Sequence, residues 1–307
     1  MIEVLKSGLF SVIQDVGRFE YQEFGMPTSG VLDLDSFRLA NWLVGNITGQ
    51  EVLEVVLIGP SLKFHGDAFV GIVGADMSPM VDGVSVSMNS TLHVTKGAVL
   101  SFGKLVSGFR TYISVFGGFG IFEEMGSKST YVNAKVGGVD GRALKKGDFF
   151  KLQKFKNLPV KSIPKRFQIQ YFSTMPIRIT EGPEFNLFTS LEISDFLSSE
   201  FTLSSDINRM GIRLEGALLS SEKEEMISSG IVNGAIQVPS NGKPIILLSE
   251  AQTTGGYPRI ANVIKSDLPF LGQLAPGSKI RFRKVSLSEA QLDYKNKEQQ
   301  YARLLNG

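Results

Sequence analysis

Tyr112-Ile-Ser-Val-Phe116 leads directly into Gly117-Gly118-Phe119, and this stretch has a counterpart in the second half of the chain. There, Ile245-Ile-Leu-Leu248 leads after a short insert into Gly255-Gly256-Tyr257. Each half then closes with a similar turn and strand, which read Leu144-Lys-Lys-Gly147-Asp-Phe-Phe and Leu274-Ala-Pro-Gly277-Ser-Lys-Ile. Internal repetition of this kind predicts two related β units in tandem.

Short runs of β-branched and aromatic residues, cut by glycine-containing turns, continue this pattern along the chain. Asp82-Gly83 and Asn241-Gly242 each separate two such runs, and Asp140-Gly141 is a third candidate hairpin turn. These dipeptides supply the positive φ angles that tight turns require. The sequence therefore predicts a mainly β fold of two tandem barrels with a few short helices.

Three helices are expected. Asp33 can cap the first, whose apolar positions recur at helical spacing until Gly45-Asn46 ends it. The second covers Phe185 to Leu197, and the third runs from Ser288, with Gln291 in the capping-box position, to about Leu305. The expected domains are a first barrel with its helix over residues 1–160, a second barrel over 161–287 and a terminal helix over 288–307. The join is expected between Lys154 and Lys165, where hydrophobic periodicity lapses.

Composition excludes several classes of function. The 307 residues are 42% hydrophobic, with 32 basic and 30 acidic residues and a net charge of +2, so neither disorder nor nucleic-acid binding is expected. The N-terminus does not resemble a secretory signal, and no apolar run is long enough to span a membrane, so a cytoplasmic protein without membrane attachment is expected. The chain has no cysteine, which excludes disulfides and thiolate chemistry.

Familiar catalytic signatures are missing. His65 and His93 are the only histidines and lie on separate predicted strands, which disfavours a histidine metal site or a Ser-His-Asp triad. Gly126-Ser127-Lys128-Ser129-Thr130 superficially resembles a phosphate-binding loop, but Ser127 separates the glycine from the lysine. No metal site is predicted on this basis.

The densest polar cluster is Gln252-Thr253-Thr254-Gly255-Gly256-Tyr257-Pro258-Arg259, which follows a strand that should be buried. A rigid strand that delivers such a loop can position a binding site, and Arg259 could hold an anionic group with two hydrogen bonds. The alternative is a structural corner of a barrel, with the glycines for the bend and a solvated arginine. The residues alone leave both interpretations open.

Two further segments combine acidic and basic residues. Asp15 and Arg18, in Gln14-Asp15-Val16-Gly17-Arg18, follow a predicted strand and either bind substrate together or form a structural ion pair. The second segment is Asn208-Arg209-Met210-Gly211-Ile212-Arg213-Leu214-Glu215, in which Arg209 lies in a predicted turn. Its two arginines suit an anionic ligand, but Arg213 and Glu215 project to the same face of a predicted strand and the alternative is that they pair with each other.

Together these segments closely resemble the PxpC/KipA family, whose members are described as the C subunit of 5-oxoprolinase, the second subunit of allophanate hydrolase or a biotin-dependent carboxyltransferase-like protein. The resemblance spans most of the chain. Its motifs here include residues 14–18, 27–33, 38–41, 44–46, 117–119, 127–130, 141–148, 209–211, 234–239, 252–258 and 266–269.

The resemblance implies two cyclophilin-like β barrels, in agreement with the tandem repeat. It also implies a B subunit of the KipI/PxpB type and a separate PxpA-like A subunit, without which the chain would be inactive. The assembled enzyme would be an ATP-dependent lactam hydrolase that opens 5-oxoproline to L-glutamate, using ATP with Mg²⁺ to activate the lactam oxygen as a leaving group.

The resemblance also suggests which residues serve that reaction. The expected catalytic residues are Arg209, Arg259, Gln252 and Tyr257, and the expected substrate-binding residues are Asp15, Arg18, Gln237, Thr253, Thr254 and Asp267. The arginines would stabilise transferring phosphoryl charge, and Asp15 or Asp267 could bind Mg²⁺ with ATP. The sequence departs from the family at Asn208, where an aspartate is usual, so no carboxylate base is available there.

Two other functions fit the resemblance. One is biotin-dependent carboxyl transfer to urea or a related amide, for which partners would supply the biotin carrier. The other is a non-enzymatic, KipA-like role as the antagonist of a KipI-like kinase inhibitor, which needs an interface rather than a reactive pocket.

Overall fold

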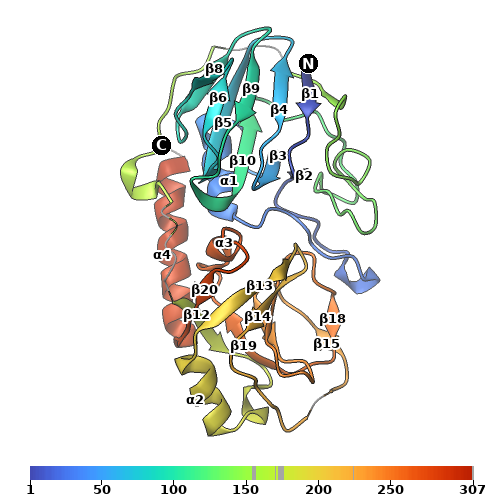
Figure 1. The fold of residues 1–307 in the computed structure, drawn as a ribbon, viewed down its shortest axis with the longest axis vertical. Coiled ribbons are helices and arrows are strands. Elements are labelled where there is room, and N and C mark those ends of the chain that lie inside the picture. The colour runs from blue at the N-terminus through green and yellow to red at the C-terminus, as the bar shows by residue number, and fades with distance from the viewer. Residues whose placement is uncertain (154–156, 170, 172–175, 224, 306–307) are drawn as a thin grey trace. The chain divides into compact units, whose positions relative to one another are not determined.

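Strands make up most of the regular structure of the chain, which confirms the predicted mainly β fold (Figure 1). The computed structural model describes residues 1–153, 157–169, 171, 176–223 and 225–305. The chain divides into two compact units, of which the first comprises Met1–Phe19 and Ser29–Tyr171, and the second Glu20–Thr28 and Phe172–Gly307. The expected join at 154–165 includes residues 154–156, which lie outside the described residues.

Two antiparallel sheets form the first unit. Their strands are β1 (Ile2–Lys6), β2 (Phe10–Gln14), β3 (Val52–Val56), β4 (Ser61–Phe64), β5 (Ala68–Asp76), β6 (Pro79–Val81), β7 (Val84–Ser85), β8 (Thr91–Val94), β9 (Val99–Phe102), β10 (Ser107–Val115) and β11 (Phe149–Phe150). One sheet has the order β11-β1-β4-β9-β6-β7 and the other β2-β3-β10-β5-β8. The short 3₁₀ helix η2 (Lys165–Phe167) lies near the end of this unit.

One apolar core lies between these two sheets. The first sheet contributes Ile2, Val4, Leu62, Phe64 and Leu100, and the second contributes Ile13, Leu53, Val55, Val70, Ile72 and Ile113. All of these side chains are almost completely buried. Alternate residues of each strand therefore face a shared interior, as in packed sheets and barrels.

Helix α1 (Leu34–Leu43) covers the other face of the second sheet, beside β5 and β10 (Figure 1). Asp33 caps it as predicted, because its carboxylate accepts a hydrogen bond from the Ser36 amide at 3.0 Å. The hydroxyl of Ser114 donates to the carbonyl of Ala40 at 2.6 Å, and that of Thr91 donates to Leu43 at 2.6 Å. The sheet thus satisfies carbonyls at the helix end that lack partners within the helix.

A single sheet closes on itself in the second unit. Its strands are β12 (Ile177–Glu181), β13 (Phe201–Ile207), β14 (Gly211–Glu215), β16 (Ala235–Gln237), β17 (Ile245–Leu247), β19 (Arg259–Val263), β20 (Lys279–Ile280) and β21 (Phe282–Lys284), in the order β20-β13-β14-β17-β16-β19-β12-β21. The first and last strands of this order are separated in sequence by Arg281 alone. The segment Lys279–Lys284 therefore pairs on one side with β13 and on the other with β12, which completes a barrel.

The second unit also contains a two-stranded sheet and several helices. These elements are η1 (Gln22–Phe24), η3 (Phe185–Leu187), α2 (Ser190–Ser198), β15 (Ser229–Gly230), β18 (Thr254–Gly255), α3 (Leu268–Leu271) and α4 (Leu287–Leu305). Phe196 of α2 stacks on Phe282 of the closing strand, with ring centroids 4.7 Å apart, which attaches the helix to the barrel. No helix among the described residues has the length and apolar character needed to cross a bilayer.

Two predicted helices need correction. The expected helix over Phe185 to Leu197 is divided into η3 and α2, because Thr189 is extended and caps α2 through a capping box with Glu192. The capping box of α4 is formed by Ser286 and Glu289 rather than by Ser288 and Gln291. In both cases a Ser/Thr-x-x-Glu sequence a few residues from the predicted start satisfies free amides of the helix.

The turn predictions are confirmed in two cases and corrected in one. Both residues of Asp82-Gly83 and of Asp140-Gly141 have positive φ, as tight turns require. In Asn241-Gly242 only Gly242 has a positive φ. Its amide donates a hydrogen bond to the Pro239 carbonyl within a longer loop between β16 and β17. Gly117 and Gly118 also have positive φ whereas Gly255 and Gly256 do not, so these repeated Gly-Gly pairs differ in conformation.

Replacing Gly71 with alanine should loosen α1 from its sheet. A Cβ at this position would lie 2.5 Å from the Ala40 carbonyl oxygen and 3.2 Å from the Leu43 Cβ, so helix and sheet would have to separate. We expect the free energy of unfolding to fall by about 1–3 kcal/mol, as for other overpacked sites. Urea unfolding followed by the fluorescence of Trp42, the only tryptophan and part of α1, measures this loss.

Gly66→Ala is the matched control, because a Cβ there would meet only Leu152 at 3.8 Å. Equal unfolding free energies for the two variants would contradict the role given to Gly71.

Candidate functional site

The predicted Gln252–Arg259 motif forms a loop that links two barrel strands, β17 and β19, which both pair with β16. Within it, β18 pairs with β15, and the Ile231 amide donates to the Thr253 carbonyl at 2.9 Å. The Met226 amide likewise donates to the Gly256 carbonyl at 2.8 Å. A second loop, residues 226–231, therefore lies beside the motif and holds its backbone.

Gln237 lies beneath this loop. It is only 2% exposed, and its Nε2 donates to the Tyr257 carbonyl at 3.3 Å. The Nε2 of Gln252 approaches the Oε1 of Gln237 at 3.5 Å. Gly255 is needed for this arrangement, since a Cβ there would lie 2.6 Å from the Gln237 Nε2. The loop thus has a buried carboxamide behind it, while Gln252, Thr254 and Tyr257 are exposed on its outer side.

Arg259 fixes the two loops to each other. Its Nε and Nη2 each donate to the Glu184 carboxylate at 2.7 Å, and its Nη1 donates to the Gly230 carbonyl at 2.5 Å. This hydrogen-bonded guanidinium holds the pKa of Glu184 below its ordinary value, and the carboxylate in turn raises the pKa of Arg259. Arg259 is 8% exposed, so the expectation of a solvated arginine is wrong. It is a residue that positions the loop.

Arg209 is held in the same way at the start of the motif. Its Nε donates to Glu250 Oε1 at 2.5 Å, and its carbonyl accepts from the Glu250 amide at 3.0 Å. Both side chains are buried. A buried pair of this kind is costly to break, because removing one partner leaves an uncompensated charge.

The remaining predicted residue of this unit, Asp267, has different partners. Its carboxylate accepts from the backbone amide of Arg178 at 2.9 Å and from its guanidinium Nη2 at 2.5 Å. It makes no hydrogen bond to the motif among the described residues. The structure therefore brings together Arg209, Gln237, Gln252, Thr253, Thr254, Tyr257 and Arg259, but not Asp267, around one loop.

Asp15 and Arg18 lie in the first unit and organise its interior. The Asp15 carboxylate accepts hydrogen bonds from the hydroxyls of Ser127 and Ser129 and from the amides of Gly17 and Lys128. Arg18 is 0% exposed and donates to the carbonyls of Glu124 and Ser129. The loop that resembles a phosphate-binding loop is thus built around an internal carboxylate.

The three arginines expected to bind phosphate do not fit that role in this arrangement. Arg18, Arg209 and Arg259 are buried and donate to internal carbonyls or carboxylates. The Asp15 carboxylate is already occupied by four donors, so it does not fit Mg²⁺ either. The described residues also contain no group of three or more His, Asp and Glu able to hold a metal ion.

Sequence reasoning missed Glu184 and the role of Glu250 as partners of the arginines. Glu184 lies 75 positions before Arg259, so no local spacing connects them. The nearby Gly182 is a weak signal, because a Cβ there would lie 2.2 Å from the Arg259 carbonyl oxygen. The requirement for glycine at this position arises from the close approach of β12 and β19, which the sequence does not reveal.

Comparison with known proteins gives matches over nearly the whole chain. The family described as carboxyltransferase domain, subdomain A and B, matches residues 24–284. The protein named as the C subunit of 5-oxoprolinase in Escherichia coli is 36% identical over 302 residues, which cover 98% of this chain and 96% of that protein. Its namesake in Haemophilus influenzae is 37% identical over 297 residues, 94% of this chain and 93% of that one. The crystal structure of Kluyveromyces lactis urea carboxylase superposes with a TM-score of 0.92 and 30% identity, over 98% of this chain and 29% of that one.

Because of the Glu184–Arg259 ion pair, the free energy of unfolding should fall as the solution becomes acidic. The pKa of Glu184 is lowered in the folded state from 4.5, so its contribution is complete above about pH 4.5 and is lost as the pH falls through the folded value. We expect the free energy of unfolding of Glu184→Gln to be about 1–3 kcal/mol lower than that of wild type at pH 7. This difference should shrink below about pH 4.5. Urea unfolding at several pH values measures this difference.

Glu225→Gln, which changes an exposed carboxylate of the same unit, serves as the control and should show no such pH-dependent difference. A Glu184→Gln difference that stays constant down to pH 3 would show that the ion pair is not the cause.

Proposed function

The chain belongs to the family of 5-oxoprolinase C subunits, a family with a carboxyltransferase domain of subdomains A and B, and on this premise we propose that it is the C subunit of an ATP-dependent 5-oxoprolinase. The complex would hydrolyse 5-oxoproline to L-glutamate together with A and B subunits. One observation carries the proposal. The match covers 98% of this chain and 96% of the 5-oxoprolinase C subunit, whereas the match to urea carboxylase covers only 29% of that enzyme.

The motif loop supplies suitable chemistry for such a substrate. A lactam presents a carbonyl acceptor and an N–H donor side by side, and a carboxamide such as that of Gln252 can bond to both. The Thr253 and Thr254 hydroxyls and the Tyr257 phenol are further groups for the substrate carboxylate. Because Arg209 and Arg259 are committed to Glu250 and Glu184, we assign them to holding the loop in shape.

The use of ATP is assigned to the assembled complex of this chain with its partner subunits. Phosphorylation of the lactam oxygen would turn a poor electrophile into one with a good leaving group. Among the described residues, both arginines of the candidate site are engaged by carboxylates, so neither is assigned to the nucleotide phosphates. The partner subunits are the expected source of that part of the reaction.

Carboxyl transfer to urea or a related amide is the second candidate. The close superposition with urea carboxylase favours it, since that enzyme contains a domain of the same fold. This chain corresponds to 29% of that enzyme, so partners would supply a biotin carrier and the remaining activities. Incorporation of labelled bicarbonate into urea distinguishes this reaction from lactam opening.

Reconstitution tests the main proposal. The chain, coexpressed and purified with candidate A and B subunits, should form glutamate from 5-oxoproline only when ATP and all three proteins are present. Glutamate is measured by coupled dehydrogenase assay. Full activity of the A and B subunits without this chain would refute the assignment, and bicarbonate-dependent carboxylation of urea would favour the second candidate.

Gln252→Ala should lower kcat/KM for 5-oxoproline about tenfold in that complex, through loss of a hydrogen bond worth roughly 1–1.5 kcal/mol. Gln300→Ala makes the same change at an exposed position of α4 and should leave kcat/KM unaltered. Pull-down of the partner subunits should be normal for both variants. Wild-type kinetics for Gln252→Ala would show that this loop is not part of the active site.

A further inference from the structure

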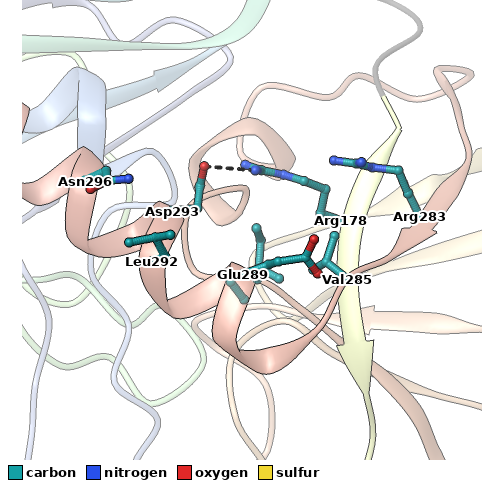
Figure 2. A pocket seen from close by; sticks show the side chains of 9 residues that line it. Arg178, Arg283, Val285, Glu289, Leu292, Asp293 and Asn296 are labelled. Atoms are coloured by element: carbon teal, nitrogen blue, oxygen red, sulfur yellow. Dashed lines mark ion pairs between the residues drawn. The ribbon is translucent and has the colours of Figure 1, made fainter.

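A cavity of about 270 Å³ lies in the second unit between β12, β21 and the first turns of α4, where Figure 2 shows its lining. It is lined by Arg178 of β12, Arg283 of β21 and Glu289 and Asp293 of α4, and by no described residue of the motif loop. Helix α4 begins at Leu287, beyond residue 284 where the match to the carboxyltransferase domain ends. One wall of this cavity is therefore formed by residues that follow the matched range.

Two arginines lie side by side in this cavity. In the parallel pairing of β12 with β21, Arg178 is the direct neighbour of Arg283 (Figure 2). Neighbouring strands are only about 4.8 Å apart, so like charges in register destabilise a sheet unless they are compensated. Arg178 is compensated twice, by Asp267 at 2.5 Å and by Asp293 at 3.1 Å.

Arg283 has no such compensation. Its guanidinium makes no hydrogen bond or close ion pair with the described residues, although its charge helps to lower the pKa of Glu289. Glu289 uses Oε2 to accept hydrogen bonds from the amide and hydroxyl of Ser286, which leaves Oε1 for another donor. The side chains of Arg283 and Glu289 are both exposed, so the open side of the cavity offers one cation without a carboxylate partner among the described residues and one carboxylate oxygen.

The rest of the lining is aliphatic. Ile264, Val285 and Leu292 contribute apolar surface. Figure 2 shows Val285 and Leu292 beside the charged groups. The volume is below the roughly 300–1,000 Å³ typical of sites for drug-sized ligands, so the occupant must be small. Arg178 and Arg283 balance Glu289 and Asp293 in charge, and a ligand with no net charge preserves that balance.

We propose that this cavity binds a free aliphatic α-amino acid, with its carboxylate on Arg283, its ammonium group on Glu289 and its side chain on the aliphatic lining. An acidic amino acid fits less well, because Arg178 already carries two carboxylates and no further cation remains among the described lining residues for a third. The ligand is therefore different from the glutamate and 5-oxoproline of the proposed reaction, and its binding does not depend on that proposal.

Calorimetric titration of the whole chain with L-leucine at pH 7 tests the proposal. Saturable binding is expected, with at least about tenfold weaker binding of L-glutamate, of isovalerate, which lacks the ammonium group, and of isoamylamine, which lacks the carboxylate. Absence of saturable leucine binding overturns the proposal. Equal binding of isovalerate or inorganic phosphate also overturns it, because the cavity would then be a simple anion site.

Variants locate the binding to this cavity. Arg283→Gln and Glu289→Gln should each weaken leucine binding at least about tenfold, and glutamine at position 289 retains the oxygen that caps α4. Ala290→Leu should abolish binding by filling the cavity without a change of charge. Arg281→Gln is the matched control, because Arg281 does not line the cavity and pairs instead with Glu200. Unchanged binding in a folded Arg283→Gln protein, judged by circular dichroism, would refute the site.

Discussion

The closing strand Lys279–Lys284 is the constraint on which the second unit depends. It is hydrogen-bonded to β13 on one side and to β12 on the other, and its pairing with β12 is parallel. A parallel pair needs a long connection, and here nearly the whole unit provides it, since β12 stands at the start and β21 at the end. The same strand places Phe282 against Phe196 of α2 and Arg283 beside Arg178. Closing the barrel therefore also fixes the helix and the cavity attached to it.

Buried charge explains why the motif loop has a defined shape. An arginine taken out of water must be paired or hydrogen-bonded, since an isolated buried charge costs several kcal/mol. Arg259 meets this need with Glu184 and the Gly230 carbonyl, and Arg209 meets it with Glu250. These residues hold the loop, which leaves Gln252, Thr254 and Tyr257 exposed for a ligand. Arg283 differs because it is exposed at the open cavity, so water solvates its charge and no carboxylate of the chain is required.

Asp15 has a comparable role in the first unit. Its carboxylate gathers donors from Ser127, Lys128 and Ser129, more than 100 residues later in the chain, and so ties the end of β2 to that segment. Four donors satisfy a buried carboxylate fully, which suits a structural anion better than a ligand for Mg²⁺. A glycine, two serines and a lysine close together thus resemble a phosphate-binding loop in sequence but surround a side chain of the protein itself.

Local patterns in the sequence determined the mainly β character, the Asp33-capped helix and the turns at Asp82-Gly83 and Asp140-Gly141, because each depends on a few neighbouring residues. The motif Gln252–Arg259 could also be found, since its polar residues are contiguous. The partners of the arginines could not, because Glu184 and Arg259 are 75 positions apart and Arg209 and Glu250 are 41 apart. Only strand register and barrel closure bring such residues together. Tertiary structure therefore decided which charges hold the fold and which remain available to bind.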